Sequence, residues 1–144
     1  ADLVVAFEAT EGLKVGLTYA SDDGLVILND NFLKQGGAFR DKLSETDPMD
    51  DVIYYLGKAG IKNVKVFPGT AVCHDEVGRL ITLNMVMLGA AVATGMIPVK
   101  PESVENAISS LTPRNAIEVN LKAFRAGMKN FKEQLDKESV KTAA

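Results

Sequence analysis

The stretch that most constrains the fold is Leu80–Val99, LITLNMVMLGAAVATGMIPV, which has no charged residue although charged residues make up 24% of the chain. A helix that is apolar on every side is buried on every side, in a protein core or in a membrane. The stretch has nearly the length of a membrane span, yet Asn84 and Thr94 interrupt it, and Gly95 and Pro98 end its helical part early. It therefore predicts a central buried helix, and we expect no membrane contact.

The composition indicates a globular, cytoplasmic protein. A chain of 144 residues, 47% of them hydrophobic, is long enough for one domain with a sizeable core. The net charge of −3 lacks the basic excess typical of nucleic-acid-binding proteins, so we expect no nucleic-acid partner. With a single cysteine, Cys73, and a single histidine, His74, the chain cannot form an internal disulfide, a cysteine-ligated cluster or a multi-histidine metal site. No signal peptide is expected.

Apolar runs alternate with helical segments along the first half of the chain. The runs Asp2–Phe7 and Leu25–Leu28 are predicted as buried strands, and Asn63–Phe67 as a third strand. Helices are expected at Glu8–Tyr19 and from Pro48 onward. This alternation predicts an α/β fold with three layers, in which a mostly parallel sheet lies between helices on both faces. Three strands are few for such a sheet, so further strands are expected upstream or from a partner.

Two further segments lie outside the predicted strands and long helices: a polar loop and the C-terminal tail. The polar loop of residues 29–47 is expected to contain a short helical piece at Phe39–Leu43. The domain is expected to span residues 1–137, and the tail of residues 138–144 is predicted to fray.

The last long helix, predicted at roughly Arg114–Lys137, carries the most regular pattern. Its apolar residues alternate at spacings of four and three, which predicts a narrow stripe packed along one neighbour, either the central helix or another protein. The stripe consists of Ile117, Leu121, Phe124, Met128, Phe131 and Leu135. Beside it lies a basic ridge, which meets an acidic partner, an electron carrier or coenzyme A phosphates, or forms the solvated face of the helix. The basic ridge consists of Lys122, Arg125, Lys129 and Lys132.

Other candidate residues each have a structural alternative. Glu8 and Glu11 follow the first strand, at the sheet edge where α/β folds bind ligands. Two carboxylates there suit acid–base chemistry; alternatively, they interact favourably with the positive end of the next helix dipole. Asn84 either contacts a ligand or partner, or caps a central helix that begins at Met85. The segment Cys73–Glu76 spreads around a helix, so its side chains are not expected to converge on a metal.

The segment Asn84–Ala90, NMVMLGA, resembles the γ-type domain of 2-oxoacid:ferredoxin oxidoreductases, the pyruvate/ketoisovalerate type, called the β-subunit in indolepyruvate enzymes. The resemblance covers nearly the whole chain, because other segments also match: Ala1–Glu8 with Glu11–Leu13, Asp23–Asn29, Thr94–Pro98, Val104–Ile108 and Val119–Gly127. Members of the family begin with a strand and a glycine-rich turn of the GFGGQG kind, which this chain lacks. The resemblance therefore implies that the family's N-terminal strands are missing, and no phosphate-contacting residue is carried over.

The resemblance implies a part in an enzyme that oxidatively decarboxylates a 2-oxoacid, with the indolepyruvate or aryl type favoured, to an acyl-coenzyme A and reduces ferredoxin. Thiamine diphosphate, the iron–sulfur clusters and coenzyme A are implied for the whole complex, with other subunits as partners. The chain itself is expected to be non-catalytic, with no catalytic, cofactor-binding or metal-binding residues. The alternative is a free-standing α/β module that binds a small molecule or nucleotide, which would need a phosphate loop of its own.

Overall fold

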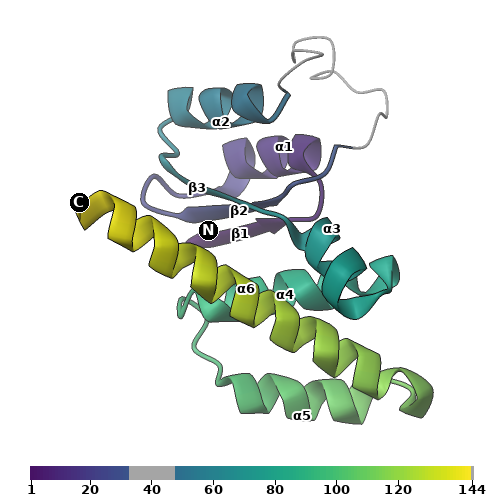
Figure 1. The fold of residues 1–144 in the computed structure, drawn as a ribbon. Coiled ribbons are helices and arrows are strands. Elements are labelled where there is room, and N and C mark those ends of the chain that lie inside the picture. The colour runs from purple at the N-terminus through teal and green to yellow at the C-terminus, as the bar shows by residue number, and fades with distance from the viewer. Residues whose placement is uncertain (33–47, 144) are drawn as a thin grey trace. The chain divides into compact units, whose positions relative to one another are not determined.

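The computed structural model describes residues 1–32 and 48–143, and the chain divides into two compact units, Ala1–Pro68 and Gly69–Ala144. The first unit contains all the strands of the described residues, and the second is helical (Figure 1). The short helix expected at Phe39–Leu43 lies outside the described residues. The single domain expected over residues 1–137 stays a prediction.

The first unit is a parallel sheet with two helices on one face. Strands β1 (Leu3–Ala6), β2 (Leu25–Asn29) and β3 (Asn63–Phe67) lie in the order β1-β2-β3. Helix α1 (Ala9–Tyr19) connects β1 to β2, and α2 (Pro48–Lys58) precedes β3 (Figure 1). Because both crossovers move along the sheet in the same direction, right-handed connections place both helices on the same face. The predicted α/β fold with a parallel sheet is confirmed.

The core of the first unit forms between this face and the two helices. Its buried side chains come from every strand and helix around it except β3, which adds the half-buried Val64; they include Val4, Ala6, Leu13, Val26, Leu28, Val52 and Leu56. Glycines let α1 lie close to the sheet: a Cβ at Gly12 would lie 2.4 Å from Cδ2 of Leu28 and 2.8 Å from Cβ of Ala6. The strands form where the sequence predicts them: β2 is buried along its whole length, whereas β1 and β3 are buried in part.

The second unit consists of helices joined by tight turns. A short helix α3 (Gly69–Val72) continues into a π-helical turn, Cys73–Val77, which ends at Gly78 with φ +81°. A 3-10 turn, Leu80–Thr82, leads into α4 (Leu83–Ala93). Helix α5 (Pro101–Leu111) and a second 3-10 turn, Arg114–Ala116, precede α6 (Ile117–Ala143).

The central helix α4 begins earlier than predicted, and Asn84 does not cap it. The helix starts at Leu83, whose N–H donates to the carbonyl of Leu80 in the preceding 3-10 turn. That turn already satisfies backbone donors at the helix start, so a side-chain cap is not required. Asn84 lies in the first turn, exposed, with its Oδ1 3.0 Å from the N–H of Met85. The predicted end near Gly95 is correct: α4 ends at Ala93 and Gly95 has φ +71°.

Helices α4 and α6 cross at a pair of glycines. A Cβ at Gly89 of α4 would lie 2.1 Å from the carbonyl oxygen of Phe124, and a Cβ at Gly127 of α6 would lie 1.9 Å from that of Val86. No side chain fits at either position, so the two backbones are in direct contact there. The apolar stripe of α6 therefore covers α4, which was one of the two neighbours predicted for it.

The core of the second unit surrounds this crossing. One hydrophobic cluster of this core has three buried members, Val92 of α4, Ile108 of α5 and Phe124 of α6. Half-buried apolar residues from the same three helices pack around them: Met85, Leu88, Val104, Leu121 and Met128, with Ile97 from the segment after α4. Figure 1 shows α6 lying along α4, with α5 beside them. Among the described residues, no helix is both long and apolar enough to cross a membrane.

The C-terminal residues expected to fray continue the last helix. Helix α6 runs to Ala143 rather than ending near Lys137. Beyond Phe131, which is fully buried, Nε2 of Gln134 donates to Oε1 of Glu138 at 3.1 Å. The half-buried Gln134 and Glu138 thus pair at a spacing of four residues, which helps to extend the helix past the apolar stripe.

Candidate functional site

The carboxyl edge of the sheet holds the first pair of predicted site residues, Glu8 and Glu11. Glu8 is the N-cap of α1, and its Oε2 accepts a hydrogen bond from the N–H of Glu11 at 2.8 Å. The Glu11 carboxylate points elsewhere and pairs with Nζ of Lys14 at 2.6 Å, on the exposed side of the helix. A carboxylate at this position is favourable because it meets the positive end of the helix dipole. Both side chains thus have structural roles, and their use in acid–base chemistry stays a prediction.

Replacing Glu8 with alanine is expected to lower the free energy of unfolding by about 1 kcal/mol, because α1 loses its cap. Glu11→Ala is the matched control; it removes only an exposed pair and is expected to cost a few tenths of a kcal/mol. Urea unfolding followed by circular dichroism measures both. Equal losses for the two variants would contradict the capping role.

A buried asparagine, Asn29, joins this edge and was not among the predicted site residues. It ends β2, is fully buried, and donates from Nδ2 to the carbonyl oxygen of Phe7 at 3.0 Å. The next residue, Asp30, donates from its N–H to the carbonyl of Phe67 at 2.9 Å, so the ends of all three strands are tied together. In the sequence, the signal that could have identified Asn29 is a polar residue directly after the apolar run Leu25–Leu28.

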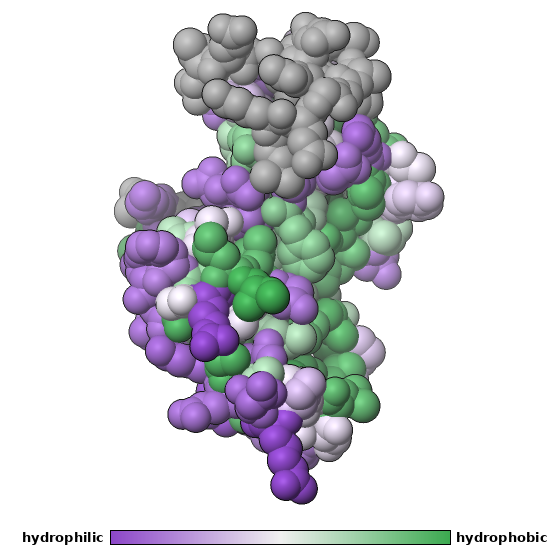
Figure 2. Space-filling view, turned by 90° about the vertical axis from the view of Figure 1, so that its right-hand side faces the viewer, coloured by the Kyte–Doolittle hydropathy of each residue, from purple (hydrophilic) through white to green (hydrophobic). Residues whose placement is uncertain are grey.

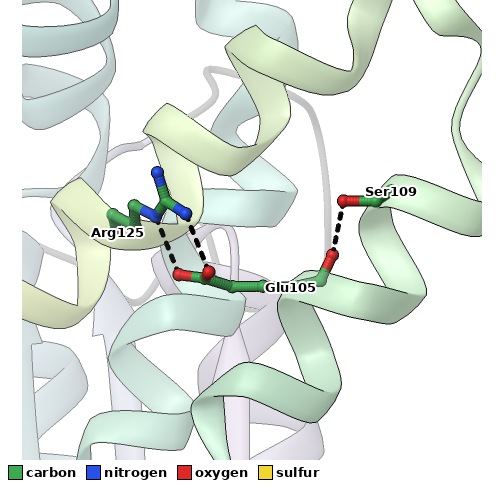
Figure 3. Close-up of polar contacts among 3 residues, drawn as sticks. All are labelled: Glu105, Ser109 and Arg125. Atoms are coloured by element: carbon green, nitrogen blue, oxygen red, sulfur yellow. Dashed lines mark hydrogen bonds and ion pairs between the residues drawn. The ribbon is translucent and has the colours of Figure 1, made fainter.

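The basic ridge of α6 is partly neutralised by acidic neighbours. Nε and Nη2 of Arg125 donate to the two carboxylate oxygens of Glu105 in α5, at 2.7 and 2.8 Å (Figure 3). Ser109, one turn further along α5, donates from Oγ to the backbone carbonyl of Glu105 at 2.9 Å (Figure 3). Lys129 lies 4.0 Å from Glu133. These pairs weaken the ridge as a surface for acidic partners.

The bidentate ion pair with Arg125 lowers the pKa of Glu105, because the hydrogen bonds from the guanidinium favour the ionised carboxylate. Because this pKa is lowered in the folded state, the ion pair stabilises the folded protein at pH values above the ordinary pKa of 4.5. This stabilisation is lost as the pH falls through the folded-state pKa.

Replacing Arg125 with glutamine is therefore expected to raise the pKa of Glu105 towards its ordinary value. The difference in free energy of unfolding from the unchanged protein should be largest near neutral pH and should shrink in acid. The matched control is Lys122→Gln, which removes one charge from the same ridge. NMR titration of the Glu105 carboxyl carbon checks the pKa, and an unchanged titration in Arg125→Gln would contradict the assignment.

The remaining candidates are exposed residues of the second unit. Asn84 is exposed in the first turn of α4, and Lys122 is exposed on α6. Glu8 and Glu11 belong to the first unit, whereas Asn84 and the basic ridge belong to the second. Their use as ligand or partner contacts stays a prediction.

The side chains of Cys73–Glu76 lie in different surroundings: Cys73 is buried, whereas His74 and Asp75 are exposed and in contact with each other. Cys73 is fully buried, and burial raises the pKa of its thiol, which keeps it in the unreactive protonated form. Nδ1 of His74 lies 2.7 Å from Oδ1 of Asp75, while Oε1 of Glu76 accepts from Nδ2 of Asn130 at 2.7 Å. Within the described part of the chain, no three His, Cys, Asp or Glu residues are placed to hold a metal ion.

Large apolar side chains reach the surface in both units. In the second unit, Leu80 and Ile81 precede α4 and are 57% and 86% exposed, and Leu111 at the end of α5 is 85% exposed. In the first unit, Tyr19 and Tyr54 are more than half exposed. Figure 2 shows one face of the molecule, on which hydrophobic residues form patches bordered by hydrophilic ones. Exposed apolar residues of this size suit contact with another protein chain.

Comparison with known proteins identifies the class of protein. Residues 1–130 match the family described as pyruvate ferredoxin/flavodoxin oxidoreductase, so the chain belongs to that family. Among curated relatives, it is 36% identical over 128 residues to indolepyruvate oxidoreductase subunit IorB of Methanothermobacter thermautotrophicus, covering 88% of this chain and 63% of the relative. The resemblance to 2-oxoacid:ferredoxin oxidoreductases is thereby confirmed.

Other relatives point the same way. The IorB subunit of Pyrococcus horikoshii is 30% identical over 150 residues, covering 94% of this chain and 66% of the relative. The 2-oxoglutarate synthase subunit KorC of Methanothermobacter marburgensis is 39% identical over 69 residues, covering 46% of this chain and 36% of the relative. The chain thus spans just under two thirds of the length of the IorB relatives. No solved structure matches the chain significantly.

The segments that carry the family resemblance form the helix crossing. NMVMLGA supplies Val86 and Gly89, and the segment Val119–Gly127 supplies Phe124 and Gly127. Their positions explain why these residue types occur there, since two glycines and the backbone opposite them set the distance between α4 and α6. These motifs build the second unit; none of the four residues is a catalytic group.

Proposed function

We propose that this chain is a non-catalytic γ-type subunit of an enzyme that oxidatively decarboxylates a 2-oxoacid to an acyl-coenzyme A and reduces ferredoxin. The favoured substrate is indolepyruvate or another aryl 2-oxoacid. The observation that carries the proposal is the similarity to IorB subunits over 88% and 94% of the chain. Similarity to KorC extends over 46% of the chain, which supports indolepyruvate ahead of 2-oxoglutarate.

The residues of this chain support placing the redox cofactors on other subunits. Iron–sulfur clusters are held by several cysteine thiolates, whereas this chain has one cysteine, Cys73, whose protonated thiol is buried. Thiamine diphosphate, the clusters and coenzyme A therefore belong, in this proposal, to the assembled complex, and this chain supplies a scaffold.

The candidate residues take partner roles in the proposal. Asn84, Lys122 and Lys129 are exposed on the second unit and are available to another subunit or to coenzyme A phosphates. Arg125 is expected to contribute less to these partner contacts, because its guanidinium is already hydrogen-bonded to Glu105. The proposal includes a cytoplasmic location, which suits the free thiol of Cys73.

Reconstitution tests the proposal. The chain is co-expressed with the thiamine-diphosphate-binding subunit of the same organism, and ferredoxin reduction is measured with coenzyme A and indolepyruvate, 2-oxoglutarate or pyruvate. We expect the two proteins to co-purify, indolepyruvate to give the highest kcat/KM, and the isolated chain to be inactive. A higher kcat/KM for 2-oxoglutarate would overturn the substrate, and full activity of the partner without this chain would overturn the subunit role.

A thermal-shift measurement separates this role from that of a free-standing ligand-binding module. The isolated chain is titrated with coenzyme A, nucleotides and 2-oxoacids. We expect no change in Tm, because the proposed role needs no ligand on this chain alone. A clear rise in Tm with one of these ligands, saturating with its concentration, would support the binding module instead.

A further inference from the structure

We draw no further inference here: the strongest candidate, the exposed apolar surface patch of Leu80 and Ile81 in the 3-10 turn before α4, carries nothing because nothing in the described structure shows what covers it.

Discussion

Replacing Gly127 with alanine is expected to lower the free energy of unfolding by about 3 kcal/mol, the upper end of the usual cost of overpacking a core. The new Cβ would lie 1.9 Å from the carbonyl oxygen of Val86, and 2.7 and 2.8 Å from its carbonyl carbon and Cα. All three are backbone atoms, so no rotamer change relieves the overlap and α4 must move away from α6. Alanine also gains about 1 kcal/mol in helix propensity over glycine, which offsets only part of this loss.

The matched control for Gly127→Ala is Gly57→Ala in α2. A Cβ at Gly57 meets nothing within 4 Å, so the same substitution is expected to stabilise the protein by about 0.5–1 kcal/mol. The chain has no tryptophan, so urea unfolding is followed by far-ultraviolet circular dichroism. Opposite signs for the two variants support the helix crossing. A Gly127→Ala protein as stable as the unchanged one would show that α4 and α6 do not approach through Val86.

Replacing Phe124 with alanine is the second large effect, and we expect a loss of about 3–5 kcal/mol in the free energy of unfolding. Phe124 is fully buried and belongs to a hydrophobic cluster with Val92 of α4 and Ile108 of α5. Truncation removes apolar contact with both of the other helices. The cavity that remains adds to the loss, because the glycine crossing next to it keeps the helices from closing in.

Two further variants make the Phe124 result interpretable. Leu111→Ala truncates an 85% exposed side chain of the same unit and is expected to change the free energy of unfolding by less than about 0.5 kcal/mol. Phe124→Leu keeps much of the apolar volume and should lose less than Phe124→Ala, which keeps the comparison usable when the alanine variant does not fold. Equal losses for Phe124→Leu and Leu111→Ala would contradict the buried position of Phe124.

These stability effects bear on function through assembly. In the proposed role, the second unit presents Asn84 and the basic ridge to other subunits on the two helices that cross at Gly89 and Gly127. A substitution that separates α4 from α6 is therefore expected to weaken co-purification with the partner, even though neither glycine is exposed. Glu11→Ala, an exposed change in the first unit, serves as the comparison.

Local signals in the sequence determined most of the secondary structure. Apolar runs predicted β1 and β2, because a strand buried in a parallel sheet is apolar along its length, and the partly apolar run NVKVF predicted β3. Pro48 and Pro101 begin α2 and α5, as expected for proline at the first helical position, and Gly95 follows the end of α4 with a positive φ. Phe124 and Phe131 of the predicted stripe of α6 are buried, but Ala123, Ala126 and Gly127 beside it are buried too, so α6 buries a broader face than the narrow stripe predicted.

Contacts between distant segments were decided only by the tertiary structure. The sequence shows that position 89 is a glycine, but not that the carbonyl group of Phe124 lies opposite it. Arg125 was a member of a basic ridge in the sequence, and its pairing with Glu105 depends on how α5 packs against α6. Asn84 suited a helix cap by residue type, yet the 3-10 turn before it had already met the need for one. Local patterns specify which segments are helices and strands, whereas the partner of each buried group depends on long-range packing that no local pattern encodes.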